Sequence, residues 1–144
     1  GSELIFYPQA KKETTYKVPD SVKFICDSSF LWCRTLSSII LPNSVTSIGD
    51  SAFSNCRELS SITFSNNLIS IGNYAFSDCR PLSSITIPEK VALIGRGAFK
   101  GCNDLEAITI SPGNLHFVLV EGFLFNKNGE LIFDPTMKEE INEG

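Results

Sequence analysis

The sequence predicts an α/β solenoid in which consecutive coils of equal length stack on one another. The first observation is a near-repetition: the segment SIGDSAFSNC at 47–56 returns as SIGNYAFSDC at 70–79, which sets the period at 23. The second is that residues 21–112 divide without a gap into four such units. One unit is too small to bury its own apolar face, so stacked units must share a continuous core.

Apolar residues recur at the same columns of every unit and define the predicted core. Several columns hold a single residue type in all four units, among them an aromatic column and a thiol column. These two columns are Phe30, Phe53, Phe76 and Phe99, and Cys33, Cys56, Cys79 and Cys102. Isoleucine, leucine and valine fill most positions of the other apolar columns, so each coil is expected to pack against its neighbours through matching side chains.

Each unit ends in L-x-x-I-x-I, whose last three positions alternate between inward and outward residues and predict a short strand. Every coil is therefore expected to add one strand to a parallel sheet, and Pro42 and Pro88 end two of these strands. The segment A-F-x-x-C-x-x-L has apolar residues three or four apart, which predicts one helical or 3-10 turn on the opposite side. Gly49, Gly72 and Gly95 suit a tight or left-handed bend.

The two ends of the chain depart from the repeat. Residues 1–20 are interpreted as the tail of a preceding hairpin block and a partial repeat, because SELIFYP at 2–8 resembles GELIFDP at 129–135. Residues 113–137 are expected to form a β-hairpin, since two apolar runs flank Asn-Lys-Asn-Gly. Residues 138–144 are a short acidic tail. This organisation indicates a piece of a longer array of repeat blocks separated by hairpins.

Composition argues against several classes of function. The net charge is −4 and no basic cluster exceeds Lys11–Lys12, so neither nucleic acid nor an anionic membrane is an expected partner. No apolar run approaches the roughly 18 residues of a membrane span. His116 is the sole histidine, and neither a nucleophile motif nor a carboxylate pair accompanies it. We therefore expect no catalytic residue, no cofactor and no metal ion, and a protein that is not an enzyme.

The cysteine column admits three interpretations, namely a metal site, a redox relay and a structural ladder. Metal sites use closely spaced ligands with histidine nearby, whereas these cysteines occur only once in each unit. Adjacent coils bring them within disulfide reach, but side chains that point the same way suit disulfide geometry poorly. We expect reduced, buried thiols that donate weak S–H bonds to backbone carbonyls. The pairing of Cys26 with Cys33 is left open.

Two groups of residues are candidates for contacts with a partner. The outward positions of the predicted strands are Ser38, Ile40, Ser61, Thr63, Ser84, Thr86, Ala107 and Thr109. Such a row is either a binding surface or a solvated sheet face. The second interpretation is open because the row lacks the Trp, Tyr and Arg residues typical of hot spots. Leu31 and Trp32 stand where the other units have polar or small residues, so they need a partner. That partner is either the N-terminal segment, through Phe6 or Tyr7, or an external molecule.

The unit V-x-x-I-G-x-x-A-F-x-x-C-x-x-L-x-x-I-x-I-P closely resembles the BspA-like leucine-rich repeat, the treponemal type of leucine-rich repeat. The resemblance covers about residues 16–135, and the C-terminal hairpin resembles the segment that punctuates repeat blocks in that family. It implies a right-handed superhelix with the parallel sheet on its concave side. The outward strand residues would then line the concave face.

Proteins of this family are typically secreted or cell-surface proteins associated with adhesion. The resemblance therefore implies a non-enzymatic, extracellular or cell-surface interaction module that binds a protein or glycan of a host or neighbouring cell. The alternative is a passive spacer block within a longer surface array, which the near-identity of the units favours. The chain is expected to be a monomer or to associate weakly end to end through exposed edge strands.

Overall fold

The structure is a computed structural model that describes residues 3–4 and 14–138, and it contains strands but no helix among these residues. Each coil carries a short and a long strand. The short strands are β1 (Glu3–Leu4), β3 (Phe24–Ile25), β5 (Ser47–Ile48), β7 (Ser70–Ile71) and β9 (Leu93–Ile94). The long strands are β2 (Thr15–Lys17), β4 (Ser38–Ile40), β6 (Ser61–Thr63), β8 (Ser84–Ile87) and β10 (Ala107–Ile110).

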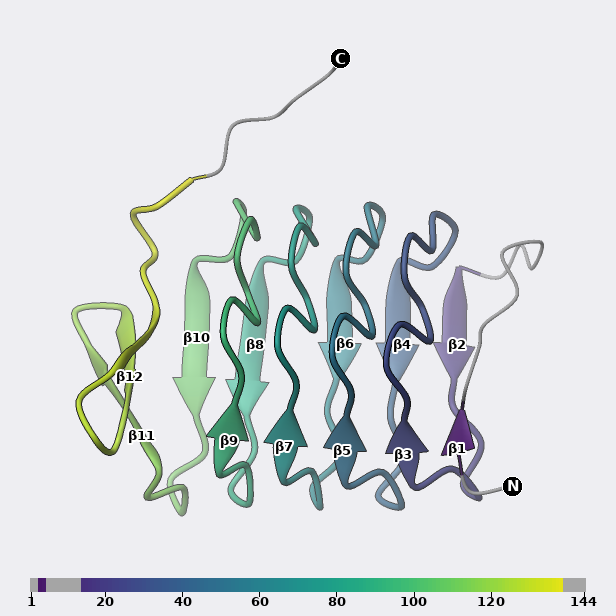
Figure 1. Ribbon diagram of the computed structural model, residues 1–144, viewed down its shortest axis with the longest axis horizontal. Coiled ribbons are helices and arrows are strands. Elements are labelled where there is room, and N and C mark those ends of the chain that lie inside the picture. Colours follow the sequence, from purple (N-terminus) through teal and green to yellow (C-terminus); the bar gives the residue numbers. More distant parts are fainter. Residues whose placement is uncertain (1–2, 5–13, 139–144) are drawn as a thin grey trace.

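The strands stack in parallel with the register that the repeat predicts. Ser38 pairs with Ser61 in the long strands and Ser47 pairs with Ser70 in the short strands, 23 residues apart in both cases. The short strands form one continuous sheet, in the order β1-β3-β5-β7-β9. Figure 1 shows this sheet in front of the long strands, which run in the opposite direction. The solenoid of 23-residue coils is confirmed, whereas its hand and its concave side stay predictions.

Each coil contributes two strands, not the one expected from the sequence. The additional strand is only two residues long and ends in the isoleucine before glycine, for example Ile48 in β5 and Ile71 in β7. Two residues are too few for the alternation of inward and outward side chains by which a strand is predicted. Neighbouring coils hold it in place instead, because the Gly72 N–H donates to the Ile48 carbonyl oxygen at 2.8 Å.

The expected helical or 3-10 turn is wrong. Between its two strands the chain forms consecutive turns, in which two residues of every coil have a positive φ. These residues are Ser28 and Trp32, Ser51 and Asn55, Tyr74 and Asp78, and Gly97 and Gly101. Left-handed residues four positions apart stop a helix from propagating. Alternate N–H groups bond to the next coil instead: the Phe53 N–H donates to the Ala75 carbonyl oxygen at 2.7 Å.

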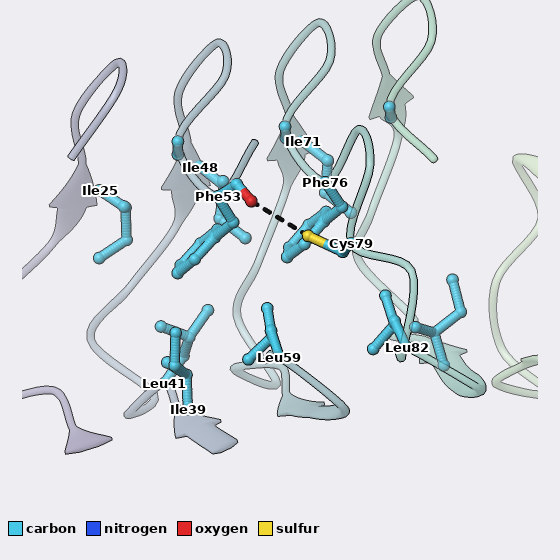
Figure 2. Packing of buried hydrophobic residues seen from close by; sticks show 14 of the residues in the cluster. Ile25, Ile39, Leu41, Ile48, Phe53, Leu59, Ile71, Phe76, Cys79 and Leu82 are labelled. Atoms are coloured by element: carbon cyan, nitrogen blue, oxygen red, sulfur yellow. Dashed lines mark hydrogen bonds between the residues drawn. The ribbon is translucent and has the colours of Figure 1, made fainter. Parts of the chain in front are cut away.

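The predicted columns fill the core (Figure 2). The four phenylalanines of the aromatic column are at most 1% exposed and stack in one pile. From Phe30 to Phe99 the successive ring centroids are 4.8, 5.1 and 5.7 Å apart. The first two spacings are close to the separation of about 4.8 Å between paired strands, so the stacking of coils sets the stacking of rings.

The ladder of long strands is interrupted in the middle of the molecule. β2, β4 and β6 form one sheet and β8 and β10 form another, and β6 does not pair with β8. The same two coils stay joined elsewhere: β5 pairs with β7, and the Asn55 N–H donates to the Ser77 carbonyl oxygen at 2.8 Å. The coils therefore splay apart only along their long strands (Figure 1).

A small antiparallel sheet follows the last coil. Its strands are β11 (Phe117–Val120), β12 (Phe123–Asn126) and β13 (Leu131–Phe133). The hairpin predicted around Asn-Lys-Asn-Gly joins β12 to β13, with Gly129 at a φ of 83°. β11 is an additional strand that was not predicted. Phe133 packs edge-on against Phe99, so this sheet covers the end of the aromatic pile.

Predictions for the chain ends lie wholly or partly outside the described residues. They are the hairpin tail within residues 1–20, the cover of Trp32 by Phe6 or Tyr7, and the acidic tail at 138–144. β2 does pair with β4 in the register of the repeat, as expected for a strand of an earlier coil.

Candidate interaction surface

The outward side chains of the long strands form the surface that the sequence singles out, here called the long-strand face. It comprises Ser38 and Ile40 on β4, Ser61 and Thr63 on β6, Ser84 and Thr86 on β8, and Ala107 and Thr109 on β10. The two β4 residues are half-buried and the others are exposed. The predicted positions therefore share one accessible face, and their role in binding stays a prediction.

Hydroxyl groups on this face bond to one another between coils. Ser61 Oγ donates to Ser38 Oγ at 3.0 Å, and the hydroxyl oxygens of Thr86 and Thr109 lie 3.1 Å apart. Each bond stays within one sheet, so the hydroxyl rows stop where β6 and β8 separate. The face thus presents ordered donors and acceptors without a charged side chain.

The separation of β6 from β8 opens a groove on the long-strand face, with a volume of about 430 Å³. This volume lies within the range of ligand-binding pockets. Ile62 and Phe64 from the β6 side line one wall and are half-buried. In the preceding coil the same columns hold Ile39 and Leu41, which are 0% and 3% exposed. The groove therefore gives a partner access to side chains that are core residues elsewhere.

Trp32 is unusual in both exposure and backbone conformation. It is 42% exposed and has a φ of 59°. Its counterparts in the other coils are Asn55, Asp78 and Gly101. Those residue types tolerate the left-handed region, whereas a bulky aromatic residue does so at a cost. The Arg57 guanidinium carbon lies 5.4 Å from the Trp32 ring centroid, so a cation–π contact from the next coil covers one side of the ring.

Replacing Trp32 by asparagine is expected to change the free energy of unfolding by less than about 1 kcal/mol. Loss of the cation–π contact costs about 0.5–1 kcal/mol at an exposed site. Relief of the left-handed backbone strain at this position offsets about 1 kcal/mol of that loss. Urea denaturation measures the difference, with Arg57→Ala as the control that removes the contact alone. A loss above about 2 kcal/mol would show that Trp32 packs against further residues and would remove it as a candidate exposed contact.

The thiol column is a ladder of hydrogen bonds between coils. In Cys56, Cys79 and Cys102 the thiol donates to a phenylalanine carbonyl oxygen of the preceding coil, with Sγ to O distances of 3.0–3.1 Å. Figure 2 shows the bond from Cys79 to Phe53. Burial raises the pKa of Cys79 well above its usual value and that of Cys102 to about 12. The predicted S–H bonds are confirmed, and no disulfide joins any of the five cysteines.

A thiol reagent at pH 8 is expected to label no cysteine of the native protein other than Cys26. That residue is half-buried, whereas the four cysteines of the column are buried. The raised pKa of Cys79 and Cys102 also suppresses the reactive thiolate. Mass spectrometry should find five labelled thiols in denaturant. Labelling of Cys79 in native buffer as fast as in denaturant would contradict this interpretation.

Acidic and amide side chains near the bends form a second structural ladder. Asp27 Oδ1 accepts the Asp50 N–H at 2.7 Å, and Asp50 Oδ1 accepts the Asn73 N–H at 2.8 Å. Asn73 Oδ1 then accepts the Arg96 N–H at 2.8 Å. Each of these three side chains therefore caps the backbone of the next coil, which explains why this column holds Asp or Asn in the first three coils.

The described residues bring no metal-binding group together. None of the His, Cys, Asp and Glu residues in this part of the chain form a group of three or more that could hold a metal ion. His116 is exposed, and its backbone N–H donates to Asn114 Oδ1 at 2.7 Å. Within the same residues, no helix is long and apolar enough to cross a membrane.

The groove between β6 and β8 was not predicted. Its one sign in the sequence is Phe64, the only aromatic residue in a column that otherwise holds Leu41, Ile87 and Ile110. A larger residue at one position of an otherwise aliphatic column marks the place where two coils pack differently.

Stacked 23-residue coils around matched apolar columns place the chain in a class of protein, the leucine-rich repeat solenoids. The family model for the BspA type leucine rich repeat region matches residues 4–128 in six copies. The chain therefore belongs to that family, and the resemblance carried by the repeat unit is confirmed.

Solved structures of bacterial leucine-rich repeat proteins are similar to most of this chain. A leucine rich cell surface protein from Faecalibacterium prausnitzii A2-165 is 40% identical with a TM-score of 0.71, over 74% of this chain and 28% of that protein. The pneumococcal vaccine antigen PcpA is 26% identical with a TM-score of 0.76, over 96% of this chain and 43% of that protein. The T. pallidum leucine rich repeat protein TpLRR is 25% identical with a TM-score of 0.58, over 74% of this chain and 62% of that protein. The chain thus matches less than two thirds of each. No curated protein matches it significantly.

Proposed function

We propose that this chain is a non-enzymatic interaction module of a secreted or cell-surface protein, and that its long-strand face binds a protein or glycan in adhesion. The observation that carries the proposal is an exposed row of outward side chains interrupted by a groove that reaches Ile62 and Phe64. The relative described as a cell surface protein and the relative described as a vaccine antigen support an extracellular location. Extended faces of solenoids are their usual binding surfaces.

The composition of the face constrains how it binds. Its outward residues are serine, threonine, alanine and isoleucine, with no charged side chain among them. Affinity should therefore come from hydrogen bonds and apolar contacts, and should depend only weakly on ionic strength. A patch of this kind needs a well-packed centre for tight binding, and the groove is the concave part of the face that can supply one.

Binding of the chain to a panel of purified extracellular-matrix proteins and to a glycan array tests the proposal. The double variant Thr63→Arg, Ser84→Arg places two large side chains on the face, and is expected to lower the amount retained by at least about tenfold. The matched control is Leu93→Arg on β9, which is 66% exposed in the other sheet. Equal binding by both variants would contradict the face as the site. If nothing in the panel or array is retained, the passive spacer interpretation replaces the interaction module.

A further inference from the structure

We propose that the antiparallel sheet at the C-terminal end, here called the cap sheet, docks a second leucine-rich repeat block, and that β13 becomes the first short strand of that block. The cap sheet comprises β11, β12 and β13 and lies at the end of the stack of coils (Figure 1). The docked block is one whose first coil has the sequence of this chain's own first coil, residues 21–43. The inference goes beyond the proposed function, because it concerns another surface and a partner of the same fold.

Both faces of the cap sheet are apolar. On the inner face Leu124 is 0% exposed, and Phe133 packs against Phe99. The outer face carries the residues that alternate with these, namely Val118, Val120, Phe123, Phe125 and Leu131. The two valines and the leucine are 50%, 53% and 52% exposed, and the two phenylalanines are half-buried. An antiparallel sheet with one face in water usually has polar residues on that face, so a second apolar face indicates that another layer packs on it.

The N-terminal segment shows how a strand of the β13 sequence pairs. Residues 3–8 read ELIFYP and residues 130–135 read ELIFDP, so the two segments differ at one position. The N-terminal segment begins with β1, which pairs in parallel with β3 of the first coil. In that register Leu4 is opposite Ile25. The C-terminal segment contains β13, and we expect it to pair in the same register with the strand equivalent to β3 in the docked block.

β13 has an edge on which this pairing can form. In the described part of the chain it pairs with β12 alone, at the end of the sheet order β11-β12-β13. The register of β1 places Leu131 opposite the residue equivalent to Ile25 in the docked block. Paired residues of adjacent strands lie on the same face of a sheet, and Ile25 is 1% exposed in the core. Leu131, which is exposed in this structure, therefore becomes a core residue of the docked block.

An irregularity in β13 allows the strand to contribute to two cores. Residues two positions apart on a regular strand lie on the same face. In the cap sheet Leu124 pairs with Phe133 and Phe125 pairs with Leu131, with a shift of register between them. Phe133 therefore lies on the inner face against Phe99, whereas Leu131 lies on the outer face with Phe125. Bulges in strands redirect side chains in this way, and here the two directions lead to opposite sides of the cap sheet.

A tandem protein tests the docking. Its sequence is residues 1–135 followed directly by residues 9–144 of a second copy, so that ELIFDP replaces ELIFYP at the start of the second block. The reference protein joins two complete chains through a flexible Gly/Ser linker of about 20 residues. Small-angle X-ray scattering is expected to show one rigid shape for the tandem protein and two independently moving bodies for the reference protein.

The substitution Leu131→Lys in the first block locates the contact. In the single chain this residue is exposed, so the midpoint of urea denaturation should fall by less than about 0.3 M. In the tandem protein the lysine lies in the core of the second block, so the midpoint should fall by at least about 1 M. Ile69→Lys in the first block is the matched control, because Ile69 is 48% exposed and lies in another coil. It should give the same small shift in both proteins.

Three outcomes overturn the inference. They are a second block that is unfolded in the tandem protein but folded in the reference protein, two independently moving bodies in both proteins, and a Leu131→Lys shift no larger in the tandem protein than in the single chain. A dimer of the single chain in sedimentation, dissolved by Leu131→Lys, would also overturn it and would assign the outer face to a second copy packed face to face. None of these changes alters the long-strand face, so the proposed function stands or falls by its own test.

Discussion

Replacement of Phe53 by alanine is expected to lower the free energy of unfolding by about 3–5 kcal/mol. Phe53 is 0% exposed and lies in the middle of the aromatic pile. Its ring is stacked on Phe30 at 4.8 Å and on Phe76 at 5.1 Å, so the substitution removes contacts in two directions at once. The cavity cannot be filled by collapse, because hydrogen bonds on both sides fix the spacing of the coils.

Urea denaturation measures this effect, with Phe24→Ala as the matched control. Phe24 lies on β3 and is 40% exposed, so its removal should cost less than about 1 kcal/mol. Each coil of a solenoid contacts only its neighbours, so a weakened second coil can also divide the transition. A smaller slope of the free energy of unfolding against urea concentration in Phe53→Ala would reveal that loss of cooperativity. Equal stability losses in the two variants would contradict the assignment of the pile as the core.

The period of the sequence was sufficient to predict the coils because stacked units repeat their contacts. A column that holds phenylalanine in every unit must fill equivalent space in every coil, and these rings are at most 1% exposed. The outward positions of the long strands followed from their alternation. Three or four residues per strand carry enough pattern for that inference, as in β8 with its exposed and buried residues in turn.

The turns between the strands could not be predicted from residue type. Ser51 and Tyr74 adopt the left-handed region although neither residue favours it. Bonds to the following coil hold them there: the Tyr74 N–H donates to the Arg96 carbonyl oxygen at 2.8 Å. A conformation set by contacts with the next coil leaves no local signal, and the apolar spacing alone resembled a helix.

The groove is a second feature that no single unit specifies. It arises from the absence of pairing between two strands 23 residues apart, while both units keep the usual strand pattern. Phe64 is visible in the sequence, but its effect depends on how its ring meets Phe76 in the next coil. The candidate site was therefore predicted as a face, and its most specific part emerged only from the packing.

The left-handed bend, one of the two alternatives expected for the glycine column, is wrong. Gly49, Gly72 and Gly95 do not have a positive φ. They are required because the backbone of the preceding coil approaches too closely for a side chain. A Cβ at Gly72 would lie 2.6 Å from the carbonyl carbon of Gly49 and 2.7 Å from the amide nitrogen of Asp50. Both are backbone atoms, which cannot rotate away.

Gly72→Ala is therefore expected to destabilise the protein by about 2 kcal/mol. Overpacking against a fixed backbone costs about 3 kcal/mol. The lower entropy of the unfolded alanine chain offsets up to about 1 kcal/mol of that cost. To make room, the coils must separate where the Gly72 N–H bonds to the Ile48 carbonyl oxygen and the Asn73 N–H to Asp50 Oδ1. The added methyl group thus breaks the ladder that holds the short-strand sheet together.

The control for this variant is Gly113→Ala. The three atoms nearest to a Cβ at that position all belong to the side chain of Glu89, which is exposed and can move aside. Without the overpacking cost, the entropic effect remains, so this variant should be unchanged or more stable by up to about 1 kcal/mol. The same glycine-to-alanine change is therefore expected to lower the free energy of unfolding at position 72 and not to lower it at position 113. Urea denaturation of the two variants measures both effects. If Gly72→Ala proved as stable as Gly113→Ala, the column would have to be explained by something other than the approach of neighbouring backbones.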